Sequence, residues 1–163
     1  MSVAFRRESD EEHKEPRFEL PLPPGPNLVT RRGLALIEAK VAELEAATAD
    51  PLADGADADA IAAREDLLRS LRYWRTRLAT AQLMASPPEG SVAFGTRFVI
   101  RLKGRQRTID IVGGDEAEPT ENRIAFFAPL ARAVIGADEG DRVDFGGEAE
   151  AIEILSAEAI PEA

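Results

Sequence analysis

The stretch that decides the fold is TRRGLALIEAKVAELEAAT, residues 30–48, followed at residues 65–81 by EDLLRSLRYWRTRLATA. Apolar residues recur in the first stretch at spacings of about three and four, which is the pattern of one face of an α-helix. They are Leu34, Ile37, Val41 and Leu44, and the pattern continues to Thr48; the second stretch repeats it at Leu67, Leu71, Trp74, Leu78 and Ala81. Both stretches therefore predict helices with a narrow apolar seam. Thr30 is the expected N-cap of the first, because its hydroxyl can accept from an amide of the first turn.

The segment between these helices, ADPLADGADAD at residues 49–59, contains a proline, a glycine and four aspartates, and it interrupts both patterns. Two helices that each have one apolar face, joined by a short connecting segment, can bury those faces only against each other or against a partner. We therefore expect an antiparallel helical hairpin with an acidic tip, formed by Asp50, Asp54, Asp57 and Asp59. Such a loop is most often only solvated. A calcium loop is disfavoured by its glycine placement and by the missing terminal glutamate.

The second arm of the hairpin is basic, with Arg64, Arg69, Arg72, Arg75 and Arg77 and few acids after Asp66. This strip is either a solvated face of the helix or a surface that lies along an RNA backbone or an acidic protein. Trp74 sits at a seam position and is expected to pack in the core.

Beyond residues 86–90 (SPPEG), where successive prolines end the helix, the pattern changes to short strands. Strands are expected at residues 92–94, 98–102, 106–112 and 123–127, a short helix at 129–135, and a closing hairpin at 143–145 and 149–155. The fold class is α+β, with a small domain at residues 90–157 made of an antiparallel sheet and one short helix. Residues 1–27, charged and then proline-rich, and residues 158–163 are expected to be tails.

The composition excludes several classes of function. The chain has no cysteine, which excludes disulfides, thiolate metal sites and cysteine nucleophiles, and its one histidine, His13, has no partners that could orient it for catalysis. The net charge of −10 argues against a general nucleic-acid binder. The sequence shows neither an apolar run that could span a bilayer nor a signal peptide, so the cytoplasm is the expected location.

Several segments together resemble the GreA/GreB family of transcription elongation factors. The C-terminal signature is carried by IVGGDEA at residues 111–117, APLARAVIG at 128–136 and EGD at 139–141, with GSVAFG at 90–95 and GGE at 146–148. LVTRRG at residues 28–33 is similar to the start of the family's first coiled-coil arm, and LATAQL at 78–83 to the end of its second. The likeness runs from about residue 27 to residue 155, and its C-terminal part is the specific one.

The resemblance implies an FKBP-like C-terminal domain that docks on bacterial RNA polymerase at the mouth of the secondary channel. It also implies a coiled-coil hairpin, spanning residues 28–86, that reaches toward the polymerase active site. Tip carboxylates would then help hold a shared Mg²⁺ ion at the polymerase active site and position the water that cleaves backtracked RNA. The factor would have no cofactor of its own and would not be an enzyme. It is expected to be a monomer whose partners are the polymerase and the nascent RNA 3′ end.

Site residues follow from the same resemblance. The tip aspartates Asp50, Asp54, Asp57 and Asp59 would supply ligands in trans, and Arg64, Arg69, Arg72 and Arg75 would face RNA or the channel. The polymerase-docking residues would be Asp115, Glu116, Pro129, Leu130 and Arg132.

This sequence departs from the family pattern at three places. The tip lacks the Gly-Asp-x-x-Glu-Asn-Ala-x-Tyr motif of cleavage-competent members, and Ala128 replaces a favoured serine. The hairpin is also shorter by roughly one heptad per arm, which would place the tip on the order of 10 Å short. The expected function is stimulation of RNA cleavage, and the alternative is a non-cleaving or inhibitory occupant of the channel. A remote alternative is a peptidyl-prolyl isomerase or chaperone, and a third is a purely structural coiled-coil dimeriser.

Overall fold

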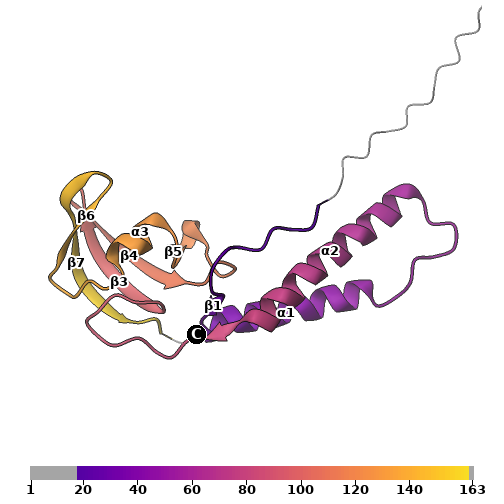
Figure 1. Ribbon diagram of the computed structural model, residues 1–163, viewed down its shortest axis with the longest axis horizontal. Coiled ribbons are helices and arrows are strands. Elements are labelled where there is room, and N and C mark those ends of the chain that lie inside the picture. The colour runs from indigo at the N-terminus through magenta and orange to yellow at the C-terminus, as the bar shows by residue number, and fades with distance from the viewer. Residues whose placement is uncertain (1–17, 162–163) are drawn as a thin grey trace, which may run out of the picture.

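The computed structural model describes residues 18–161, in which a helical hairpin and a five-stranded sheet lie end to end (Figure 1). Residues 1–17, which are most of the expected N-terminal tail, and residues 162–163 lie outside the described range. Residues 18–26 contain no helix or strand. Within residues 18–161 no helix is both long and apolar enough to cross a membrane.

The hairpin consists of α1 (Arg31–Thr48) and α2 (Ala58–Thr80), which run side by side (Figure 1). The seam is as expected at its centre, where Val41 and Leu44 are buried against Leu71, with Leu67, Trp74 and Leu78 packed around them. Thr30 is confirmed as the N-cap of α1, since its Oγ1 accepts from the amide of Gly33 at 2.9 Å. The periodic apolar positions thus do pack against each other.

A two-stranded sheet that the sequence did not predict closes the base of the hairpin. Strand β1 (Leu28–Val29) enters α1, and β2 (Gln82–Leu83) leaves α2; the two pair in parallel. The amide of Gln82 donates to the Asn27 carbonyl at 2.8 Å, and that of Met84 to the Val29 carbonyl at 3.1 Å. Both ends of the hairpin are therefore fixed to each other by main-chain hydrogen bonds.

The second part of the chain is a sheet with strand order β5-β4-β3-β7-β6. Its strands are β3 (Thr96–Leu102), β4 (Arg105–Val112), β5 (Arg123–Ala125), β6 (Arg142–Phe145) and β7 (Glu148–Ala159). A 3₁₀ helix, η1 (Pro119–Glu121), precedes β5, and α3 (Pro129–Val134) follows it. Ala128 precedes α3 without a side-chain cap, as its methyl group requires.

Three details of the sequence prediction are corrected here. The sheet is not wholly antiparallel, because β5 pairs in parallel with β4; residues 113–122 supply the crossover that a parallel pair needs. Residues 92–94 form no strand; instead Val92 exchanges main-chain hydrogen bonds with Gly136 and Ala137 beyond α3. The last strand passes the expected boundary at residue 157, and the amide of Ile160 still donates to the Gly95 carbonyl at 2.9 Å.

One face of the sheet carries the core. Because side chains alternate along a strand, every second residue of β3, β4 and β7 points to this face. The buried set comprises Phe98, Ile100, Ile109, Ile111, Ile152 and Ile154, covered by Ala131 and Val134 of α3. The residues between them, among them Arg97 and Asp110, lie on the opposite face.

Candidate functional site

The four tip aspartates are all exposed, but they are not equivalent. Asp57 is the N-cap of α2, and its Oδ1 accepts from the amide of Ala60 at 2.8 Å. Asp59 lies in the first turn of α2, where a negative charge is favourable beside the amides of the helix N-terminus. Asp50 and Asp54 remain in the loop. Two of the four carboxylates thus have a role in starting the second helix.

No three His, Cys, Asp or Glu side chains within residues 18–161 are grouped so that they could hold a metal ion. The tip alone therefore offers fewer than three grouped carboxylates. Carboxylate oxygens suit a hard cation such as Mg²⁺, but the remaining ligands would have to come from elsewhere.

The basic strip of α2 is engaged within the chain. Arg64 donates to the carbonyls of Asp50 at 2.7 Å and Thr48 at 3.0 Å, so it ties the tip loop to the end of α1. The other three form ion pairs: Arg69 with Asp66 at 2.7 Å, Arg72 with Glu19 at 2.6 Å, and Arg75 with Glu45 at 3.0 Å. Because exposed pairs such as the last two are weak, a polyanion could displace the carboxylates.

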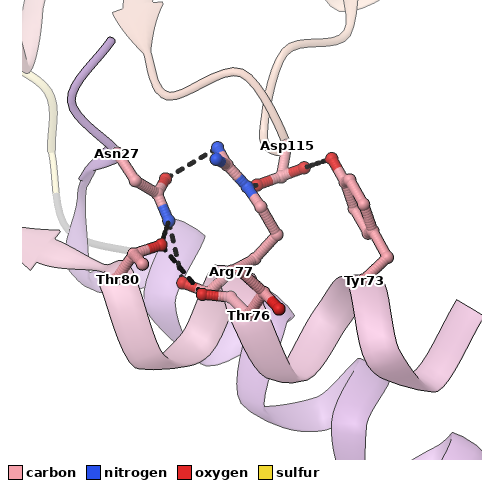
Figure 2. A network of polar contacts seen from close by, with 6 residues as sticks. All are labelled: Asn27, Tyr73, Thr76, Arg77, Thr80 and Asp115. Carbon is pink, nitrogen blue, oxygen red and sulfur yellow. Dashed lines mark hydrogen bonds and ion pairs between the residues drawn. The ribbon is translucent and has the colours of Figure 1, made fainter. Parts of the chain in front are cut away.

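Arg77, which the sequence placed in the same strip, has a different position (Figure 2). It is buried, and its Nε donates to Oδ2 of Asp115 at 2.6 Å, in the loop after β4. Its Nη2 donates to Oδ1 of Asn27 at 2.7 Å, and the amide group of Asn27 donates back to the Arg77 carbonyl at 2.8 Å. Tyr73, one turn earlier, donates its hydroxyl proton to Oδ1 of Asp115 at 2.7 Å. We call these four residues the joint.

The joint is a buried ion pair with its hydrogen bonds satisfied. The side chains of Arg77 and Asp115 are 6% and 10% exposed, and both carboxylate oxygens of Asp115 have a donor. Burial of the phenol, together with its hydrogen bond to the Asp115 carboxylate, raises the pKa of Tyr73 to about 12. Such a network fixes one geometry between the hairpin and the sheet.

A second contact lies beside the joint, at the start of α1. Thr30, while capping the helix, donates its hydroxyl proton to Oε2 of the buried Glu116 at 2.6 Å. Two glycines permit this approach: a Cβ on Gly33 would lie 2.9 Å from that same oxygen, and one on Gly113 only 2.4 Å from the Leu28 carbonyl oxygen. The loop after β4 therefore touches the hairpin base so closely that a side chain would push them apart.

Asp115 and Glu116 are predicted to contribute to polymerase docking, and that role stays a prediction. In the structure both carboxylates face the hairpin base, where they accept hydrogen bonds from Thr30, Tyr73 and Arg77. Arg77, Tyr73 and Asn27 were missed as site residues. A signal was present, since Tyr73 and Arg77 are four apart on one helix and lie on one face of it. Their partner Asp115, however, lies 38 residues from Arg77 and 42 from Tyr73 in the sequence, and no periodicity reveals it.

The other three predicted docking residues lie on α3. Pro129 and Arg132 are exposed, and Leu130 is partly buried against the core. Phe127 and Ile135, at 46% and 41% exposure, flank them. The helix thus presents an apolar surface with one basic residue, and Phe127 and Ile135 belong to it although the sequence did not single them out.

Comparison with known proteins identifies the second part of the chain. Residues 87–159 match the family model described as "Transcription elongation factor, GreA/GreB, C-term". This part of the chain is a GreA/GreB C-terminal domain. The matched range holds the whole five-stranded sheet, α3, and both carboxylates that face the hairpin. The hairpin itself lies outside that range.

Curated GreA and GreB proteins are similar over part of their length. The chain is 40% identical to a GreB of Neisseria meningitidis over 100 residues, 56% of this chain and 60% of that protein. It is 44% identical to a GreA of Methylococcus capsulatus over 70 residues, 40% of this chain and 44% of that protein. The chain thus spans less than two thirds of the length of these relatives. Among solved structures, a GreA/GreB factor of Nitrosomonas europaea aligns at 16% identity with a TM-score of 0.38, covering 83% of this chain and 99% of that one.

Proposed function

We propose that this chain is a bacterial transcription elongation factor that binds RNA polymerase and acts through its secondary channel. The observation that carries the proposal is a GreA/GreB C-terminal domain joined rigidly to a two-helix rod with an acidic end. In this interpretation the sheet is an FKBP-like docking domain and the rod is a coiled coil that enters the channel. The chain acts as a monomer in the cytoplasm and is not itself an enzyme.

Docking on the polymerase is assigned to the exposed surface of α3. Phe127, Leu130 and Ile135 supply apolar area, and Arg132 adds a positive charge at its edge. Protein interfaces combine an apolar centre with a polar rim in this manner. Asp115 and Glu116 contribute indirectly, because they set the angle at which the hairpin leaves the docked domain.

The chemistry is assigned to the tip. Asp50 and Asp54 lie in the loop and do not cap α2, and Asp59 lies in the first turn of that helix. When Mg²⁺ is bound in the polymerase active site, it supplies a Lewis acid that activates the attacking water. The carboxylates of this chain would complete the ligand set of that ion and orient the water, while the polymerase breaks the RNA bond.

A specific observation supports the alternative of a channel-occupying regulator that does not promote cleavage. Asp57 is committed to capping α2, so fewer carboxylates are free to move toward an ion. The arms are also short: 18 residues in α1 and 23 in α2 correspond to roughly 27 Å and 34 Å of helix. Arg69, Arg72 and Arg75 would line the channel in either case, exchanging their present carboxylates for RNA or polymerase.

The test is RNA cleavage in a reconstituted backtracked complex of the cognate polymerase. We expect the wild type to accelerate cleavage and the triple variant Asp50→Ala, Asp54→Ala, Asp59→Ala to lose the effect while still binding. Asp57 is left intact so that α2 keeps its cap. The matched control removes three exposed carboxylates outside the tip: Glu38→Ala, Glu89→Ala and Glu148→Ala. If the wild type binds polymerase but leaves cleavage unchanged or slows it, the chain is a channel-occupying regulator and the cleavage role is wrong. If the wild type does not bind polymerase, both proposals are refuted.

A further inference from the structure

A cleft of about 690 Å³ lies between the hairpin base and the sheet, on the sheet face opposite α3. Its floor is formed by residues of β3, β4, β5 and β7, including Arg97, Asp110 and Arg123. One wall is the first turn of α1, with Arg31 and Arg32. The other is the segment that follows α2. The volume falls within the range of pockets that hold small molecules, and such pockets favour interfaces between structural units.

The charge of the cleft is opposite to that of the molecule. Four arginines line it, Arg31, Arg32, Arg97 and Arg123, against two carboxylates, Asp110 and Glu116. Two of the arginines are paired with carboxylates: Arg97 forms a bidentate pair with Asp110, at 2.8 and 3.0 Å, and Arg123 an ion pair with Glu121 at 2.8 Å. Glu116 accepts from Thr30. The chain as a whole has a net charge of −10. The excess positive charge of the lining therefore lies on Arg31 and Arg32, at the first turn of α1, and it favours an anion at that wall of the cleft.

The wall facing the arginines is apolar and held in place. Leu83 and Met84 are 51% and 42% exposed, although the β1–β2 pairing and a hydrogen bond from the Met84 amide fix their backbone. Phe94 adds a ring that packs edge-on against Phe126, with centroids 5.6 Å apart. Exposed apolar side chains suit contact with a flat apolar group, because that contact removes their apolar surface from water.

An extended peptide fits the floor poorly. Strands β3, β4 and β7 are all interior in the strand order, so their main-chain groups already pair on both sides and cannot accept another strand. A compact ligand with an anionic end and a planar apolar body satisfies both walls at once. Arginine is the side chain best suited to phosphate, since its planar fork donates two parallel hydrogen bonds.

We propose that this cleft binds a nucleoside phosphate, with its phosphates on Arg31 and Arg32 and its base against Met84 and Phe94. The ligand would touch both the hairpin and the sheet, so its binding would stabilise their present arrangement. This inference goes beyond the proposed function and does not depend on polymerase binding.

The test uses the full chain alone in isothermal titration calorimetry, with ATP as the probe and a chelator present to remove divalent cations. We expect ATP to bind, and adenosine and inorganic triphosphate each to bind at least about tenfold more weakly. Adenosine lacks the phosphates that contact the arginines, and triphosphate lacks the base that contacts the apolar wall. Arg32→Glu should weaken ATP binding by at least about tenfold. Its matched control is Arg107→Glu, an exposed arginine on the opposite face of β4.

A second pair of variants tests the apolar wall without risk to the core. Met84→Ala should weaken ATP binding, whereas Leu36→Ala, an equally exposed apolar residue on α1 outside the cleft, should not. Absence of ATP binding at millimolar concentration overturns the proposal, as does equal affinity in Arg32→Glu and Arg107→Glu. If triphosphate alone binds as tightly as ATP, the assignment of a nucleoside is wrong.

Discussion

Replacing Asp115 by alanine removes the one carboxylate that the buried Arg77 faces. The guanidinium would keep only its hydrogen bond to Asn27, in a position where the side chain is 6% exposed. Removing one partner of a buried ion pair costs about 3–5 kcal/mol, because the remaining charge is left uncompensated. The Tyr73 hydroxyl also loses its acceptor, at a cost of about 1 kcal/mol. We expect Asp115→Ala to lower the free energy of unfolding by about 3 kcal/mol or more.

Urea denaturation measures this loss. With an m-value of about 2 kcal/mol per molar, the midpoint should fall by about 1.5 M. The control is Asp110→Ala, which breaks the Arg97 pair; there the arginine is 37% exposed and water can solvate it, so about 1 kcal/mol is expected. The reasoning is refuted if Asp115→Ala costs no more than Asp110→Ala. A double-mutant cycle with Arg77→Met should recover most of the loss, because the stranded charge is then absent.

Three further predictions concern single positions. Tyr73 is the only tyrosine, so the ultraviolet absorbance of tyrosinate reports it directly: its midpoint should lie near 12 in the folded chain and near 10 in urea. Because the folded pKa is the higher one, this group's stabilisation is complete below about pH 10 and lost as the pH rises toward 12, and Tyr73→Phe should remove that part of the pH dependence. Gly113→Ala should separate the loop from β1, since its Cβ would lie 2.4 Å from the Leu28 carbonyl oxygen; a thermal midpoint unchanged from the wild type would contradict this. Asp57→Ala should cost about 1 kcal/mol by circular dichroism melting, and Asp57→Ser should restore most of it by capping α2 in the same way.

The hairpin could be predicted from the sequence because its information is local. The seam spacing, the Thr30 cap and the Gly55 breaker each act within a few residues, and the helices begin and end close to those signals. The short helix that begins at Pro129 could likewise be predicted, because proline is favoured at the first position of a helix. Local chemistry determined these features, so one sequence sufficed.

The joint could not be predicted, because it depends on which segments meet in space. Asp115 follows a strand and Arg77 lies in a helix, and either would be an ordinary exposed charge without the other. The parallel β4–β5 pairing was missed for a similar reason: a strand of three residues, Arg123–Ala125, carries no alternation from which its direction could be inferred.

The strand order also determines when each part of the chain can fold. The central strand β3 takes one of its two neighbours from the very end of the chain, with Thr96 opposite Ala159. The hairpin, by contrast, is built from contacts between neighbouring helices. During synthesis the hairpin can therefore form before β7 has joined the sheet. The pairing of β3 with β7 has to close a long loop, whereas the helices of the hairpin are neighbours in sequence. Arg77 can be buried only when the loop that carries Asp115 meets α2, and we expect this contact to form after the hairpin itself.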